Sequence, residues 1–120
     1  LMYGCFRSDR GLPPRSWLPM TPIKANDGWC DALGDRNYNC PVQLPYPAGH
    51  EVMMRQDRLY DVVIVMDYNI TQRMSRGGSA IFFHIAKPHY PPTEGCVAIS
   101  PPDMAWLLPR IDARTVMAIG

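Results

Sequence analysis

The chain has no long hydrophobic run, no excess of either charge and no closely spaced pair of cysteines. Apolar runs such as Val62 to Met66 fall far short of the roughly 20 residues that span a bilayer. Twelve Lys and Arg face 11 Asp and Glu without blocks of one sign. Nucleic-acid and anionic-lipid surfaces need a basic patch, so we expect no nucleic-acid partner and no membrane span.

No cationic segment precedes an apolar stretch in these residues, so we expect a signal peptide to be either absent or already removed. The 120 residues start at Leu1 and suffice for one domain, so we expect residues 1–120 to be a single domain from a fragment or processed form. The sequence leaves its oligomeric state open.

Cysteine pairing and metal binding have weak support. Of the four cysteines, only Cys30 and Cys40 are near enough in sequence to close a local loop. The sequence alone does not decide whether these two form a disulfide. Structural zinc sites use short paired spacings, which are absent from the available ligands; we therefore expect no metal and no cofactor. These ligands are Cys30, Cys40, His50, His84, His89 and Cys96.

Proline and glycine are abundant, with 13 and nine residues, and prolines interrupt most of the first fifty positions. Long helices are therefore excluded there. We expect an irregular lead-in over 1–20 and an extended loop with Asn and Asp turns over 21–46.

The second half contains the stronger secondary-structure signals. Apolar and β-branched runs predict strands over 59–68, 79–86, 96–99 and 114–119, the first two paired, and the segment 51–55 is a short strand or helix. Ser100, two prolines and Asp103 predict a capped helix over about 101–109, with Met104 on its apolar face.

A histidine and a cysteine stand close to each other along this half of the chain. His84 lies near the end of a predicted strand, and Cys96 follows a Pro-rich loop. An imidazole that takes the thiol proton yields the nucleophilic thiolate and can later protonate a leaving amine. The alternative is that both residues only fill the core.

The turn before the cysteine fits this chemistry. Gly95 allows a sharp turn and close approach of a substrate, which leaves the N–H of Cys96 free to face an oxyanion. Thr93 can orient the turn or bind the substrate. His89, inside the Pro-rich loop, is the alternative base, and His50 is interpreted as a solvated loop residue.

The run from Gly78 to Ser100 resembles the active-site motif of the YkuD-type L,D-transpeptidases. In that motif a strand histidine precedes a Ser/Thr-x-Gly-Cys turn that holds the nucleophile. His84, Thr93, Gly95 and Cys96 fall on the motif positions. A bacterial subgroup is similar also in its Gly-Ser-Ala-Ile-Phe segment, its Pro-rich loop and its Thr-Glu-Gly-Cys-Val-Ala segment.

This resemblance implies a mainly β fold, an L,D-transpeptidase-like curved sandwich with one short helix, and a chain that lacks the family's N-terminal strands. It also implies acyl transfer on peptidoglycan stem peptides through a Cys96 thioester, cell-wall organisation and cell shape as the context, and the envelope or periplasm as the location. Upstream segments resemble the same subgroup. We expect Trp29, Tyr38 and Asn39 there to contact substrate, or else to anchor their loop to the core.

Two positions depart from the motif. Many members have a histidine where this chain has Glu94, and an arginine where it has Ala98. Two other functions therefore remain open. The protein is an L,D-carboxypeptidase or cysteine amidase if water is the acceptor, and a non-catalytic wall-binding module if these departures abolish activity.

Overall fold

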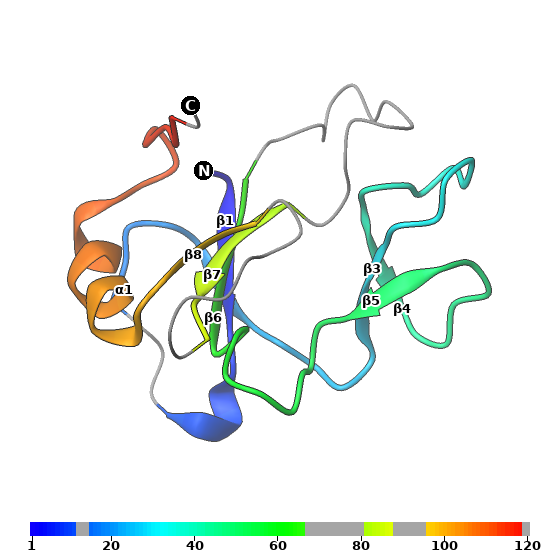
Figure 1. Cartoon of the computed structure of the whole chain (residues 1–120), viewed down its shortest axis with the longest axis horizontal. Coiled ribbons are helices and arrows are strands. Elements are labelled where there is room, and N and C mark those ends of the chain that lie inside the picture. The colour runs from blue at the N-terminus through cyan, green and yellow to red at the C-terminus, as the bar shows by residue number, and fades with distance from the viewer. Residues whose placement is uncertain (12–14, 67–80, 88–95, 119–120) are drawn as a thin grey trace.

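A computed structural model describes residues 1–11, 15–66, 81–87 and 96–118 of the chain. Within these ranges the fold is mainly β, with two sheets and one short α-helix (Figure 1). The strands are β1 Tyr3–Phe6, β2 Met20–Pro22, β3 Asp27–Cys30, β4 Pro41–Gln43, β5 His50–Val52, β6 Val62–Val65, β7 Phe82–Ile85 and β8 Val97–Ile99. The helix α1 spans Pro101–Leu107, and 3₁₀ turns cover Ser8–Arg10 and Leu108–Arg110.

The larger sheet has the strand order β2-β1-β6-β7-β8. β1 pairs parallel with β2 and antiparallel with β6, where Tyr3 lies opposite Val65. β7 pairs antiparallel with β6 and parallel with β8. The expected irregular lead-in over 1–20 is therefore wrong for residues 3–6, which form a strand inside the sheet because both of its edges find partners.

The smaller sheet, β4-β3-β5, is antiparallel throughout. It lies in the segment that we expected to be an extended loop, so that expectation is wrong for β3 and β4. Gly28 obscures the strand signal, although it lies in close packing: a Cβ at this position would lie 2.7 Å from a methyl carbon of Leu44, which would have to move. His50 begins β5 and is half-buried, rather than lying in a solvated loop.

A β-bulge ends the β3–β4 pair. The Asn39 N–H donates to the Cys30 carbonyl at 2.9 Å, and the Cys30 N–H donates to the Cys40 carbonyl at 2.9 Å. Asn39 has φ 59°, the left-handed conformation that the first residue of such a bulge adopts. Because asparagine tolerates this conformation better than most residues, the Asn-rich turn signal has a direct structural basis.

Helix α1 begins as its sequence predicts. The Ser100 hydroxyl accepts a hydrogen bond from the Asp103 N–H at 3.3 Å, and prolines occupy the first turn. Met104 is buried, whereas Trp106 lies on the outside with the Arg110 guanidinium 4.1 Å from its ring centroid. The predicted strand over 114–119 is not formed in its described part, residues 114–118.

Both faces of the larger sheet are covered. A helix-side cluster covers one face and comprises Leu18, Ile64, Met66, Phe83, Ile85, Met104, Leu108 and Ile111. An inter-sheet cluster joins the opposite face to the smaller sheet and comprises Ile23, Trp29, Met53, Tyr60, Val63, Val65 and Phe82. Strands covered on both faces show continuous apolar runs rather than alternation, which explains the sequences of β6 and β7.

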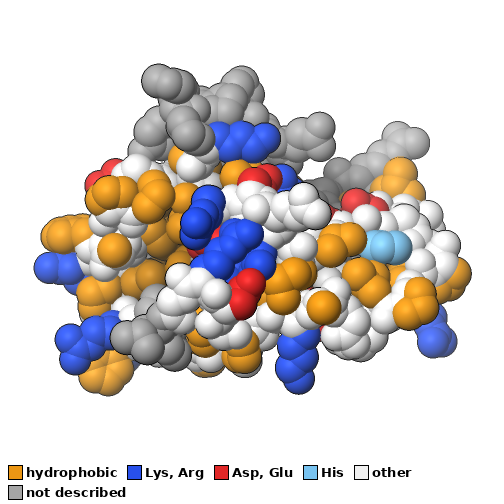
Figure 2. Space-filling model, turned by 90° about the horizontal axis from the view of Figure 1, so that it is seen from below, with side chains coloured by type: hydrophobic (Ala, Val, Ile, Leu, Met, Phe, Trp, Pro, Cys, Tyr) orange, Lys and Arg blue, Asp and Glu red, His pale blue; other side chains and the backbone are white. Residues whose placement is uncertain are grey.

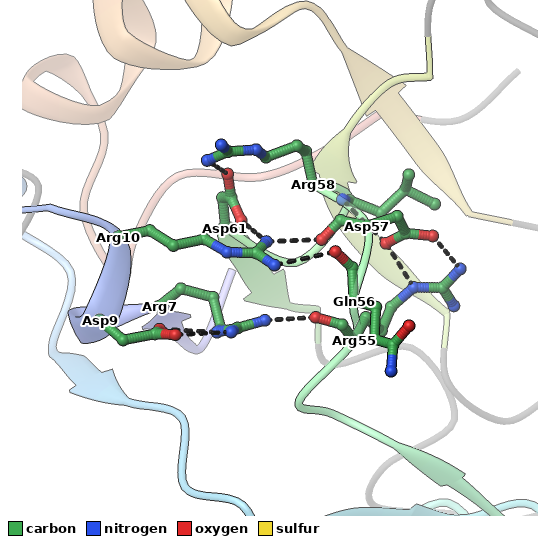
Figure 3. A network of polar contacts seen from close by, with 9 residues as sticks. Arg7, Asp9, Arg10, Arg55, Gln56, Asp57, Arg58 and Asp61 are labelled. Carbon is green, nitrogen blue, oxygen red and sulfur yellow. Dashed lines mark hydrogen bonds and ion pairs between the residues drawn. The ribbon is translucent and has the colours of Figure 1, made fainter.

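A network of charged side chains holds the segment 55–61 against the start of the chain (Figure 3). Arg7 donates to the Arg55 carbonyl, and Arg10 donates to the Asp57 and Gln56 carbonyls at 2.6 and 2.8 Å. Arg10 also pairs with Asp61 at 2.6 Å. On the face of the molecule that Figure 2 shows, basic side chains gather near the middle with acidic ones among them. These contacts fix the backbone that leads into β6.

Among the described residues, no helix has the length and apolar character needed to cross a membrane.

Candidate active site

The register of β7 and β8 brings the candidate nucleophile and base to one sheet face. His84 lies opposite Ala98, and Phe83 lies opposite Val97. Cys96 directly precedes β8, so it falls beside Phe82. Side chains alternate along a strand, and therefore Phe82, His84 and Cys96 all face the smaller sheet. Strand spacing and rise place the Cα atoms of His84 and Cys96 roughly 8 Å apart.

Cys96 is half-buried and packs against the inter-sheet cluster. Its Sγ accepts a hydrogen bond from the Phe82 backbone N–H at 3.4 Å. A hydrogen bond donated to sulfur stabilises the thiolate relative to the thiol. This contact therefore favours the nucleophilic form of Cys96.

His84 is the one polar side chain in β6 and β7, and it is only 3% exposed. Its Nδ1 lies 2.8 Å from the Ile85 carbonyl oxygen. A carbonyl can only accept, so Nδ1 carries the hydrogen, and Nε2 is left as the basic nitrogen. The ring is thus held in the tautomer that a general base requires.

Burial lowers the pKa of His84, and the positive charge of Arg55 lowers it further. The hydrogen bond to Ile85 and the negative charge of Asp57 act in the opposite direction but do not reverse the shift. The imidazole is therefore neutral at neutral pH and able to accept a proton.

Tyr60 lies beside both candidate catalytic residues. Its ring packs edge-to-face on His84 with centroids 5.6 Å apart, and on Phe82 at 5.8 Å. Burial raises the pKa of Tyr60, as do the hydroxyl's contact with Glu51 and the nearby charge of Cys96. Sequence reasoning missed Tyr60, because an aromatic residue at the start of a buried strand is indistinguishable from ordinary core.

The three expected substrate contacts, Trp29, Tyr38 and Asn39, are all buried. The indole Nε1–H of Trp29 donates to the Asn39 side-chain oxygen at 3.0 Å, and its ring meets Phe82 edge-on at 5.0 Å. This placement fits the anchoring alternative. Through Trp29 and Phe82 the bulge is linked to the sheet face that carries the site.

The remaining candidates divide into two groups. Thr93, Gly95 and the alternative base His89 lie outside the described residues, as does Glu94. All four cysteines are described and none forms a disulfide; Cys30 donates its thiol hydrogen to Asp35 at 3.4 Å. In the described part of the chain, no three His, Cys, Asp or Glu side chains converge as metal ligands would.

A thiol beside a buried neutral imidazole, on one face of a two-sheet β fold, is an arrangement used by cysteine-dependent enzymes. A family model for the L,D-transpeptidase catalytic domain, YkuD, matches residues 3–119. The chain therefore belongs to the YkuD family of L,D-transpeptidase catalytic domains. No curated protein and no solved structure matches it.

Proposed function

We propose that the protein is an L,D-transpeptidase that transfers acyl groups between peptidoglycan stem peptides, with Cys96 as nucleophile and His84 as general base. The observation that carries this proposal is the shared sheet face of Cys96 and His84, with Nδ1 of His84 bound to the Ile85 carbonyl. The family match to residues 3–119 supports the reaction class.

The reaction proceeds in two halves. His84 Nε2 takes the thiol proton while Sγ of Cys96 attacks the carbonyl of the L-centre residue in a tetrapeptide stem. The C–N bond to the terminal D-residue breaks, and the imidazolium returns the proton to the leaving amine. The amine of a second stem then attacks the thioester carbonyl and passes a proton to His84. The C–S bond breaks, and the sulfur of Cys96 is restored beside its base.

The turn before Cys96 supplies the remaining groups. The backbone N–H groups of Gly95 and Cys96 stabilise the oxyanion, and Thr93 orients the turn or the stem peptide. Trp29, Tyr38 and Asn39 support the wall of the site from beneath, in keeping with their burial. Peptidoglycan as substrate locates the reaction in the cell envelope.

Replacement of the nucleophile tests the proposal. C96A and C96S are expected to abolish both cross-link formation and release of the terminal D-residue from purified muropeptides. Chromatography and mass spectrometry of the reaction products measure both activities. Cys5→Ser is the matched control, because this half-buried cysteine lies on β1. Full turnover by C96A would rule out the thiol mechanism.

The products of the unchanged protein decide the acceptor. Dimeric muropeptides establish transfer to an amine, whereas shortened monomers alone establish that water is the acceptor and that the protein is a carboxypeptidase. A protein that binds wall fragments but forms neither product is a binding module.

A further inference from the structure

The Tyr60 side chain, which packs on His84, has contacts at both its ring and its hydroxyl. The Tyr60 ring lies against the imidazole, and the Tyr60 hydroxyl donates a hydrogen bond to the Glu51 carboxylate. Glu51 belongs to β5 of the smaller sheet, whereas His84 belongs to β7 of the larger one. Tyr60 therefore connects the two sheets at the position of the candidate base.

Arg55 fixes the other side of Tyr60. Its guanidinium lies 5.2 Å from the Tyr60 ring centroid and 3.8 Å from Glu51. Its Nε and Nη2 donate to the Asp57 carboxylate at 2.9 and 2.6 Å. The network in Figure 3 holds the backbone of this segment through the carbonyls of residues 55–57. Tyr60 is thus restrained at its hydroxyl, its ring and its backbone.

The His84 side chain, by contrast, makes one hydrogen bond within the described part of the chain, from Nδ1–H to the Ile85 carbonyl. That bond fixes one ring nitrogen but leaves the ring plane free to tilt about it. The edge-to-face contact with Tyr60, at an interplanar angle of 65°, restricts this tilt. Loss of the contact would let Nε2 turn away from the thiol without unfolding the strand.

We infer that Tyr60 is a positioning residue that aims Nε2 of His84 at Cys96, and that Glu51 acts with it by holding the Tyr60 hydroxyl. The inference rests on the proposed function, because it assumes the Cys96–His84 pair. Through Glu51 on β5, the smaller sheet takes part in positioning the candidate base.

The test measures how fast iodoacetamide alkylates Cys96 as a function of pH, with peptide mass spectrometry separating it from the other three cysteines. Transfer of the thiol proton to an imidazole aimed at it gives a thiolate–imidazolium pair, and the attraction within that pair lowers the apparent pKa of Cys96 below the ordinary value of about 8.5. Where that pKa lies above 6.5, each further unit by which it rises reduces the thiolate fraction, and with it the alkylation rate at pH 6.5, about tenfold. This readout reports ring orientation rather than overall stability.

Three variants probe the chain from Glu51 to His84. Y60L removes the ring contact and is expected to slow alkylation at pH 6.5 about tenfold. Y60F removes the hydroxyl donor and E51A removes its carboxylate acceptor, so each is expected to give a smaller loss of about threefold. The double variant, with the hydroxyl of Tyr60 and the carboxylate of Glu51 both removed, is expected to slow alkylation no more than either single variant. The effects of two residues that act through one bond are not additive.

Tyr46→Phe is the matched control. The Tyr46 hydroxyl also donates to a carboxylate, Asp35, at 2.5 Å, but its ring packs on His50 instead of His84. It is expected to leave the pH profile of Cys96 unchanged. Melting temperatures of all variants show how much stability each one loses.

The outcomes separate the two proposals. An apparent pKa near 8.5 for Cys96 in the unchanged protein would overturn the catalytic pair and with it this inference. A lowered value that Y60L, Y60F and E51A all leave in place, as Y46F does, would overturn the positioning role of Tyr60 and Glu51 alone. Because Y60F keeps the apolar ring, the test stands even if Y60L does not fold.

Discussion

A single polar side chain in a buried strand sets the chemistry of the candidate site. His84 lies between residues of β7 that are otherwise apolar, and burial keeps its pKa below the ordinary value. The unfolded chain therefore binds a proton that the folded protein does not, once the pH falls below about 6.5. The folded state is fully stabilised above that pH and loses stability as the pH drops below it.

This linkage predicts a pH dependence of unfolding. The free energy of unfolding is expected to fall between about pH 6.5 and 5, above the range in which the aspartates with lowered pKa, such as Asp57, are protonated. His84→Gln is expected to flatten the slope in that window. Urea denaturation at several pH values measures it, and an unchanged slope in the variant would contradict the assignment.

Among the elements, the β-bulge at Asn39 shows how local geometry restricts residue choice. Asn39 needs a left-handed backbone, and its side chain accepts the Trp29 indole hydrogen bond. Left-handed geometry costs a residue with a Cβ about 1–2 kcal/mol. The position therefore combines a backbone requirement with a side-chain requirement.

Two substitutions separate these requirements. Asn39→Gly and Asn39→Ala both remove the acceptor of Trp29, and each is expected to lower the free energy of unfolding by about 1–3 kcal/mol. The glycine variant is expected to be the more stable by about 1 kcal/mol, because only glycine adopts positive φ without cost. Thermal and chemical denaturation measure the difference.

The control pair is placed at Asn26, an exposed residue whose φ is not positive. There the order should reverse, with alanine more stable than glycine. The same order at both sites would show that backbone geometry does not govern Asn39.

Sequence reasoning found the elements whose signals are local. The β-branched run of β6 and the apolar run of β7 indicate buried strands by themselves, and Ser100 with its prolines indicates a helix start. β1 and β3 were missed because glycine and cysteine occupy their short sequences. β1 exists through its pairing with β6, far along the chain, and β3 through pairings across loops with β4 and β5, which its own short sequence does not report.

For the candidate site, the spacing and the motif indicate His84 and Cys96. No sequence pattern indicates the contacts of Tyr60 with His84 and Glu51, since these depend on how the two sheets pack. The burial of Trp29 and Asn39 likewise follows from that packing rather than from their loop-like sequence.

At the scale of the whole molecule, the inter-sheet cluster joins the smaller sheet to the larger one. Trp29 is central to this contact through its ring on Phe82 and its bond to Asn39. Truncation of a buried tryptophan costs about 3–5 kcal/mol. We expect that Trp29→Ala loosens the smaller sheet first, because the larger sheet keeps its helix-side cluster.

Hydrogen exchange followed by mass spectrometry tests this order of opening. In Trp29→Ala, amides of β3 and β5 are expected to lose protection, while those of β6 and β7 retain most of theirs. Trp106→Ala is the matched control, since its side chain is 61% exposed and should change stability by less than about 1 kcal/mol. Uniform loss of protection in Trp29→Ala would show that the two sheets open as one unit.

The position of β1 has a consequence for how the protein is made. Its residues are synthesised well before β6, to which Tyr3–Phe6 must pair and which follows only at Val62–Val65. Nascent β1 therefore waits with an unpaired edge until β6 has been synthesised, and pairings so distant in sequence form slowly. Trimming the first six residues for expression would remove a strand from within the larger sheet and leave β2 separated from β6.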